Sequence, residues 1–110
     1  MNHLPAIQVS RAADGVTTVA LSATAMSEEN LDATRHELFP LADSLLTGEL
    51  QLDFSQVTSL GSSALGLLLT LNRRTTKAGG HLALCGLAPH LQQLLRLIRL
   101  DTILDVRRGD

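Results

Sequence analysis

The stretch Gly61-Ser62-Ser63-Ala64-Leu65-Gly66 links the two segments of the chain that have the clearest structural signals. Before it, residues 50–54 (Leu-Gln-Leu-Asp-Phe) predict a β-strand, and a turn-like Ser-Gln pair follows. After it, the segment from Ala64 to Lys77 has six apolar residues in its first eight and then becomes basic. The sequence therefore predicts a strand, a tight polar loop and a buried helix.

Two adjacent hydroxyl groups, those of Ser62 and Ser63, fall where the loop becomes the helix. A helix N-terminus has unpaired N–H groups and the positive end of the helix dipole, so a phosphate added there is stabilised by its own helix. The pair raises the hypothesis of phosphate-controlled binding. The simpler interpretation is that Ser62 only caps the helix, as serine often does.

Gly66 argues against capping as the whole explanation, because a glycine inside a helix is about 1 kcal/mol less favourable than alanine. It lies four residues after Ser62 and hence on the same helix face. The row continues through Thr70 and then Arg73 or Arg74. A small, polar face beside a hydroxyl suits the close approach of a partner protein. Close packing against the domain's own loop is the alternative.

The composition predicts one globular domain without nucleic-acid binding. The 110 residues fit a single domain, 1–110, with a core from about residue 5 to 106 and frayed ends. Phe39 and Phe54 are the only aromatic residues, and Lys and Arg never cluster beyond pairs. Without basic stripes or stacking aromatics, nucleic-acid binding has little support.

The chain also predicts a cytoplasmic location. The single Cys85 cannot form an internal disulfide, which suits a reducing compartment, and we expect it to be a buried structural thiol. No basic segment precedes a long apolar run, so no signal peptide is visible. No stretch approaches the roughly 18 consecutive apolar residues of a membrane span, so we expect no membrane insertion.

The first half of the chain predicts a hairpin and a helix. A strand with Ile7 and Val9 is followed by an Ala-Asp-Gly turn and by the β-branched run 16–21, the pattern of an antiparallel hairpin. Ser27 then caps a predicted helix, with acidic residues in its first turn. Pro40 predicts a kink or a restart near residue 41, and Gly48 is the expected end.

The second half predicts two further strand–helix units. The central helix ends at a Gly-Gly pair, 79–80, and the strand 81–86 follows. Pro89 begins a helix that runs through Ile98, and residues 101–106 add a short final strand. The order is β-β-α-β-α-β-α-β, an α/β domain with a mixed, mostly parallel sheet of about five strands, covered by helices on one or both faces.

The catalytic signals are weak, and we predict no enzyme, no metal and no cofactor. The four histidines are scattered, without partners at metal-ligand spacing: His3, His36, His81 and His90. Asp53, at the end of a strand, is expected to bond local amides at least as much as to act in a site. A serine elbow and the lysine of a phosphate-binding loop are both missing. An anion- or small-ligand-binding module at the same helix N-terminus stays open.

Residues 52–69 (LDFSQVTSLGSSALGLLL) resemble the signature of STAS domains, the family of bacterial anti-sigma-factor antagonists. That signature has a strand, L-D-L-S-x-V-x-x-I, then D-S-S-G-L-G and an apolar helix. The likeness continues through the basic helix end, the Gly-Gly pair and strand 81–82, and through residues 89–101, whose leucine-rich end is also usual. It covers about residues 16 to 106.

The resemblance implies a mixed sheet with helices packed on it and a phosphorylatable residue at the start of the central helix. In the family this is the Ser or Thr after the motif Asp, which corresponds to Ser62, with Ser63 as second choice. It also implies an anti-sigma factor that is a serine kinase as partner, and a phosphatase; a homodimer stays open. We expect the partner-binding residues to be Gly61, Ser62, Ser63, Gly66, Thr70 and Arg73.

The sequence departs from the family pattern at three places. Gly61 stands where the family has Asp, Ala64 replaces the glycine after the serines, and residues 23–26 (Ala-Thr-Ala-Met) replace a G-x-L-D turn. Two interpretations follow. One is a phosphorylated antagonist that regulates transcription, with a relaxed motif. The other is a module that binds its partner constitutively, as a scaffold or as an accessory subunit of a larger assembly such as a stress-signalling complex or a lipid transporter.

Overall fold

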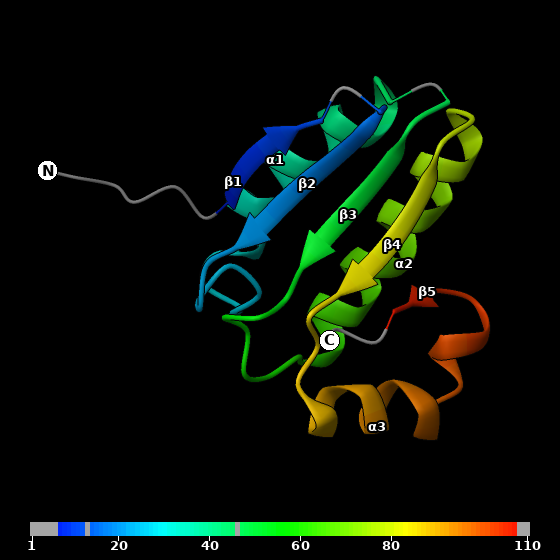
Figure 1. The fold of residues 1–110 in the computed structure, drawn as a ribbon. Coiled ribbons are helices and arrows are strands. Elements are labelled where there is room, and N and C mark those ends of the chain that lie inside the picture. Colours follow the sequence, from blue (N-terminus) through cyan, green and yellow to red (C-terminus); the bar gives the residue numbers. More distant parts are fainter. Residues whose placement is uncertain (1–6, 13, 46, 108–110) are drawn as a thin grey trace, which may run out of the picture.

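The computed structural model describes residues 7–12, 14–45 and 47–107, so the chain ends, His3 and Ala13 of the predicted first turn lie outside it. The predicted order of strands and helices is confirmed (Figure 1). The elements are β1 (Ile7–Arg11), β2 (Val16–Leu21), α1 (Leu31–Asp43), β3 (Glu49–Asp53), α2 (Ser62–Lys77), β4 (His81–Cys85), α3 (Pro89–Leu97), the 3₁₀ helix η1 (Leu100–Thr102) and β5 (Asp105–Val106).

The five strands form one sheet in the order β1-β2-β3-β4-β5. β1 pairs with β2 antiparallel, and every other neighbouring pair is parallel, as predicted. The hairpin turns at Gly15, whose φ of +85° suits glycine. The Gly15 carbonyl also accepts a 3.1 Å hydrogen bond from the amide of Glu49, which ties the turn to the start of β3.

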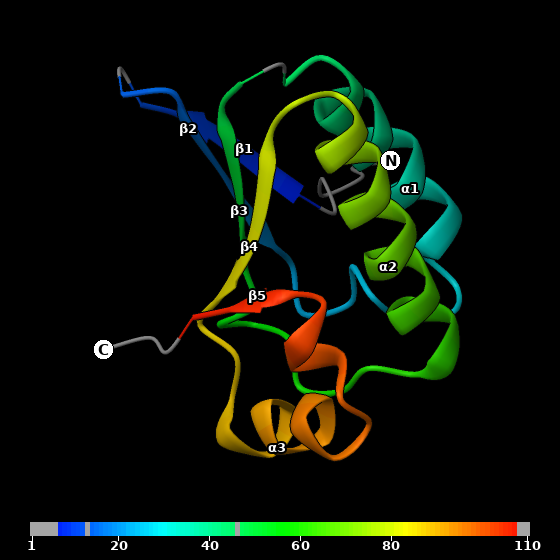
Figure 2. The ribbon, with the colours of Figure 1, turned by 90° about the vertical axis from the view of Figure 1, so that its right-hand side faces the viewer.

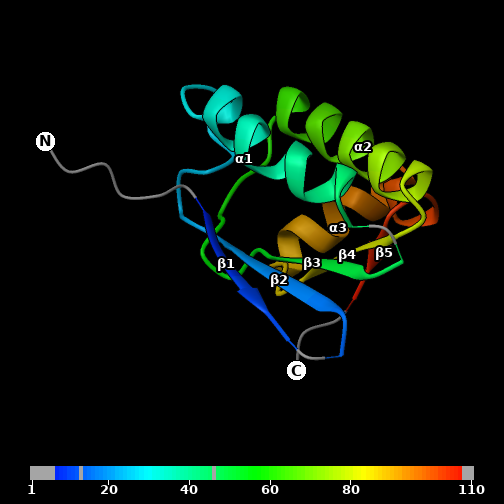
Figure 3. The same ribbon diagram turned by 90° about the horizontal axis from the view of Figure 1, so that it is seen from above.

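Both long helices pack on the same face of the sheet (Figures 2 and 3). Along β3, Leu50 and Leu52 are fully buried beneath them, whereas the alternating Glu49, Gln51 and Asp53 are partly exposed on the other face. α3 lies beyond the carboxyl ends of β3 and β4 (Figure 1), where Leu91 and Leu95 seal the end of the core. In the described part of the chain, no helix covers the second face of the sheet.

The limits of α1 differ from the prediction. The helix begins at Leu31 with Asn30 as its cap, and Ser27 instead donates its hydroxyl to the Thr24 carbonyl at 2.8 Å. The Asn30 amide donates to the same carbonyl at 2.9 Å, so these polar side chains close a turn and delay the helix. The predicted start at Ser27 was therefore wrong.

The predicted end of α1 near Gly48 was also wrong, because the helix ends at Asp43. Gly48 lies instead where a Cβ atom would be 2.7 Å from the Gly15 carbonyl oxygen. One continuous helix passes through Pro40, so the predicted restart near Leu41 does not occur. Because Pro40 sits in the last turn, its missing N–H removes a single hydrogen bond near the helix end.

The predicted boundaries after the central helix hold better. Gly79 follows the last turn of α2 with a φ of +95°, and Pro89 is the first residue of α3. The final strand is shorter than the predicted 101–106, because η1 occupies residues 100–102. Leu104, which is 2% exposed, anchors the chain just before β5.

A charged network on the helix-free face joins β3, β4 and β5, and no local pattern in the sequence predicts it. The Arg107 guanidinium donates to Glu49 at 2.6 Å and to Asp105 at 3.1 Å. Nε2 of His81 lies 2.7 Å from the same Asp105 carboxylate. The hydrogen bond from Arg107 lowers the pKa of Glu49, and that with His81 is the main cause that lowers the pKa of Asp105. The network fastens the short β5 to the sheet.

Replacing Arg107 with glutamine tests this network. We expect the free energy of unfolding at neutral pH to fall by up to about 1 kcal/mol, because the pairs are partly exposed. Carboxylates whose pKa is lowered in the folded state stabilise it above their ordinary values of 4.5 (Glu49) and 3.8 (Asp105). That stability is lost as the pH falls through the lowered values.

The acid dependence of the Arg107→Gln variant should therefore be shallower than that of the unchanged protein, as measured by urea unfolding at a series of pH values. Arg11→Gln, at an exposed position of β1, is the matched control. The same acid dependence in the protein and in Arg107→Gln would contradict a role for the network.

Candidate functional site

The N-terminus of α2 leaves both candidate hydroxyls exposed. Gly61, in an extended conformation with φ −85° and ψ 176°, is the N-cap, and no side chain caps the helix. Ser62 and Ser63 are the first two helical residues and are exposed. The interpretation that Ser62 caps the helix was therefore wrong: a cap residue needs non-helical backbone, and Ser62 already has helical backbone.

This helix end is electrically uncompensated. The first turn of α2 has no acidic residue, and the Leu65 amide donates a 3.0 Å hydrogen bond to the Gly61 carbonyl. The first amide groups of a helix have no partner within it, and they carry the positive end of its dipole. An anion attached to Ser62 or Ser63 would therefore meet a favourable field.

The loop that leads to the serines is anchored at several points. Phe54, Val57 and Leu60 are buried in the core. The Asp53 carboxylate accepts a 2.9 Å hydrogen bond from the amide of Ser55, so this acid bonds a local amide, as we expected of a strand-end residue.

A second tie comes from α3, where Nε2 of His90 lies 2.7 Å from the carbonyl oxygen of Thr58. This contact joins the start of α3 to the middle of the β3–α2 loop. The loop is thus held from both the core and α3, and these contacts fix the position of Ser62 at its end.

The outward face of α2 is small near the serines and basic at the far end. The buried side consists of Ala64, Leu67, Leu68, Leu71 and Thr75. Gly66 is exposed, and a Cβ atom added to it would meet no heavy atom within 4 Å. The alternative that Gly66 packs against the domain's own loop was therefore wrong. Thr70, which we predicted in the same row, is half-buried.

Helical spacing alone did not distinguish Arg73 from Arg74, but the structure gives the two side chains different contacts. Arg74 points to α1, where its guanidinium donates to Asp43 at 2.9 Å and lies 4.3 Å from the centre of the Phe39 ring. Arg73 is exposed and lines a groove beside α2. Arg73 therefore belongs to the outward face, whereas Arg74 joins the two helices.

The histidines and the cysteine are not grouped with the serines. The hydrogen bonds of His36, His81 and His90 go to Asp32, Asp105 and Thr58, respectively. Burial raises the pKa of the half-buried Cys85 thiol, which favours its protonated form. Within residues 7–12, 14–45 and 47–107, no group of three or more His, Cys, Asp or Glu side chains is placed to hold a metal ion.

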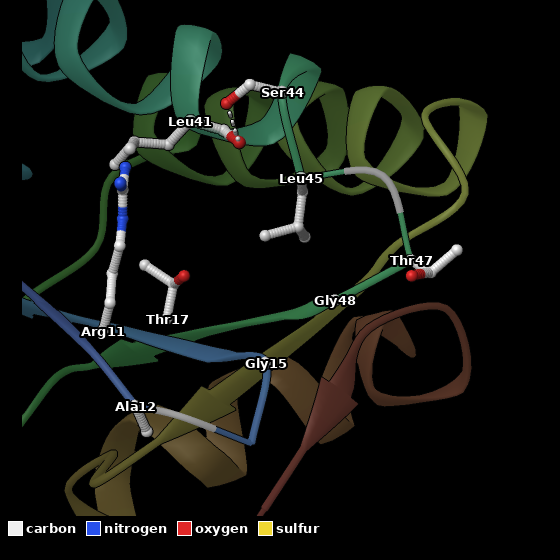
Figure 4. A pocket seen from close by; sticks show the side chains of 9 residues that line it. All are labelled: Arg11, Ala12, Gly15, Thr17, Leu41, Ser44, Leu45, Thr47 and Gly48. Carbon is white, nitrogen blue, oxygen red and sulfur yellow. Dashed lines mark hydrogen bonds between the residues drawn. The ribbon is translucent and has the colours of Figure 1, made fainter.

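A hollow of about 590 Å³ lies at the opposite end of the molecule, between the β1–β2 turn and the end of α1 (Figure 4). Arg11 and the hydroxyls of Thr17, Ser44 and Thr47 line it together with apolar groups such as Leu41. Its described lining contains neither a carboxylate nor a histidine. It therefore offers no pairing of a nucleophile with a base, and it is separate from the serines. No helix in the described residues is long and apolar enough to cross a bilayer.

Residues 9–105 match the family model described as "Mlab, STAS domain". The chain is a STAS domain. The match covers all five strands except the first two residues of β1 and the last residue of β5, together with the three helices. The family that the sequence resembles is thus confirmed. No curated relative matches the chain.

Solved structures share the fold at low sequence identity. An anti-sigma-factor antagonist (STAS) domain protein from Planctomyces limnophilus has a TM-score of 0.81 at 21% identity, over 94% of this chain and 90% of that one. Protein TM1081 of Thermotoga maritima has a TM-score of 0.77 at 21% identity, over 99% and 84%. The Bacillus cell fate determinant SpoIIAA in its phosphorylated form has 0.69 at 15%, over 96% and 92%. The STAS fold of anti-sigma-factor antagonists is therefore shared along nearly the whole domain.

The open space at Gly66 leads to a stability prediction. Gly66→Ala should raise the free energy of unfolding by about 0.5–1 kcal/mol, because alanine favours the helix and the new methyl group meets nothing. Chemical denaturation of the two purified proteins measures the difference.

Gly80→Ala is the matched control, since its Cβ would lie 2.5 Å from Leu45 Cδ2 and 2.9 Å from the Gly48 carbonyl oxygen. This variant should be less stable than the unchanged protein. A loss of stability in Gly66→Ala would show that the outward face of α2 is covered by part of the chain.

Proposed function

We propose that this STAS domain is a cytoplasmic regulatory module that binds an anti-sigma factor with serine kinase activity through the outward face of α2. Phosphorylation of Ser62 by that partner releases it, and a phosphatase restores binding. The observation that carries the proposal is the exposed, uncapped start of α2, with Gly66 open to close approach one turn later. A helix interior that contains glycine gives up stability, and room for a partner supplies a reason for it.

The local electrostatics favour a phosphate at Ser62, and the same phosphate disfavours binding of the partner. The helix N-terminus stabilises the added charge, and no acidic residue in the first turn repels it. In the complex, the same phosphate would have to be desolvated against the partner, which weakens binding.

SpoIIAA, a solved anti-sigma-factor antagonist with this fold, is described in both a phosphorylated and an unphosphorylated form. Phosphorylation is thus compatible with the fold in that protein. At 15% identity the likeness carries the fold alone, so the switch in this chain depends on Ser62 and its surroundings.

The second candidate function is constitutive binding, as the accessory subunit of a larger assembly such as a lipid transporter. Two observations favour it: the matching family model is described as Mlab, and the acid that precedes the family's acceptor serine is a glycine here. The same outward face of α2 would then bind its partner without a phosphate switch.

A kinase assay separates the two candidates. The purified domain is incubated with ATP and a candidate anti-sigma factor of the serine-kinase type from the same organism, and intact mass is measured for the unchanged chain, Ser62→Ala and Ser63→Ala. The switch predicts one added phosphate that only Ser62→Ala abolishes. No added mass in the unchanged chain, with tight partner binding, would overturn the switch in favour of the constitutive subunit.

A negative charge at Ser62 should also weaken the complex. We expect Ser62→Asp to lower partner affinity by roughly 5- to 150-fold, corresponding to about 1–3 kcal/mol. Calorimetry with the same partner measures it, and Ser10→Asp, at an exposed position of β1, is the control for added charge alone. Equal affinities for the unchanged chain and Ser62→Asp would place the interface elsewhere or remove Ser62 from it.

A further inference from the structure

A groove runs beside the second half of α2 and is closed on its other side by the turn that precedes β5. Its lining residues are Leu69, Asn72, Arg73, Thr76, Lys77 and Ile103. We propose that the partner contributes an acidic, amphipathic helix that packs in this groove. The inference names the partner segment for the proposed function and rests on it.

The apolar part of the groove is an exposed, rigidly held isoleucine. Ile103 is 58% exposed, and the half-buried Leu69 faces it across the groove. The amides of Ile103 and Leu104 both donate to the Leu100 carbonyl, at 3.0 and 2.8 Å, and Leu104 is buried. A β-branched side chain on a fixed backbone loses little freedom on binding. Ile103 thus offers a preformed apolar contact.

The rim of the groove is positively charged. Arg73 and Lys77 are exposed and lie one helical turn apart. No carboxylate of the described residues pairs with either, whereas the neighbouring Arg74 is paired with Asp43. Lys77, a cation in the last turn, also suits the helix dipole, but the dipole does not account for the isoleucine beside it. Carboxylates one turn apart on a partner helix would meet both cations.

The groove continues the surface that the proposed function uses. From Arg73 the outward face of α2 runs back through Leu69 to Gly66 and then Ser62. Two packed helices have axes 8–10 Å apart, depending on the side chains between them. A glycine at the contact therefore allows the partner helix to come close near Ser62. A phosphate there would then face an acidic segment, and like-charge repulsion would separate the two.

A membrane surface fits these residues less well than a protein helix. The groove contains two cations and one exposed isoleucine, and the exposed Asp101 lies two residues before Ile103. Stable membrane attachment needs a larger apolar face or more basic residues. Vesicles are therefore included in the test as the alternative outcome.

The test uses the whole domain, labelled with ¹⁵N, and synthetic helical peptides as probes. The acidic peptide has leucines along one face and glutamates flanking them one turn apart. A second peptide has lysine at every glutamate position, and a third has the composition of the first in scrambled order. We expect amide shifts at Leu69, Arg73, Lys77 and Ile103 with the acidic peptide, and weaker binding as salt is added.

Charge reversal gives the decisive comparison. In the double variant Arg73→Glu with Lys77→Glu, affinity for the acidic peptide should fall by roughly tenfold or more, and affinity for the lysine peptide should rise. Ile103→Ser should weaken both interactions, and Arg11→Glu should change neither. Unchanged circular dichroism and melting temperature verify that each variant folds.

Equal binding of the acidic, basic and scrambled peptides would overturn the inference. So would binding to phosphatidylglycerol vesicles without peptide binding, which would indicate a lipid surface. Failure of the inference is distinguishable from failure of the proposed function. If Ser62→Asp weakens binding of the candidate kinase-type partner but the double charge reversal does not, the proposed function is supported. The inference of an acidic partner helix is then contradicted.

Discussion

The structure depends on one geometrical constraint: the parallel strands follow one another across the sheet in a single direction. β2, β3 and β4 are neighbours in chain order, so both crossovers move the same way across the sheet. Right-handed connections then place α1 and α2 on the same face, as Figure 3 shows. α2 therefore has two sides with different roles: its leucine-rich side packs in the core, and its other side faces outward.

The same constraint explains both uncovered surfaces. Along β3 the residues on the helix-free face of the sheet are polar, and Arg107 brings Glu49 and Asp105 into one network that pairs their charges within the domain. The outward face of α2 is different, because Gly66 is open and Arg73 has no acid partner in the described chain. The charges of the network on the helix-free face are paired within the domain, whereas Arg73 on the outward face of α2 has no such partner among the described residues. We therefore assign binding to α2.

Much of the fold was predictable because its signals are local. The Asp-Gly turn, the strand before the serines, the Gly-Gly end of α2 and Pro89 each act within a few residues, and all four predictions were confirmed. The start of α1 was not predictable, since it depends on which groups the side chains of Ser27 and Asn30 bond. The contact between Arg107 and Glu49 joins residues 58 positions apart and has no local signal.

The site was predictable in part. Helical spacing placed Ser62, Gly66 and the arginines on one face, but it could not tell Arg73 from Arg74, because Phe39 and Asp43 of another helix decide between them. The groove also escaped prediction, since Ile103 reaches α2 only after the chain has passed through α3 and η1. Periodicity identifies the face of a helix, whereas tertiary contacts decide which side chains on it remain available.

The central claim is that partners bind the outward face of α2, and hydrogen exchange tests it most directly. The domain is exchanged alone and in complex with the candidate kinase-type anti-sigma factor, and protection is compared along the chain. We predict slowed exchange in the β3–α2 loop, the first turn of α2 and the turn around Ile103, with β1 and the helix-free face of the sheet unchanged. Protection confined to β1 or to the helix-free face would contradict the account.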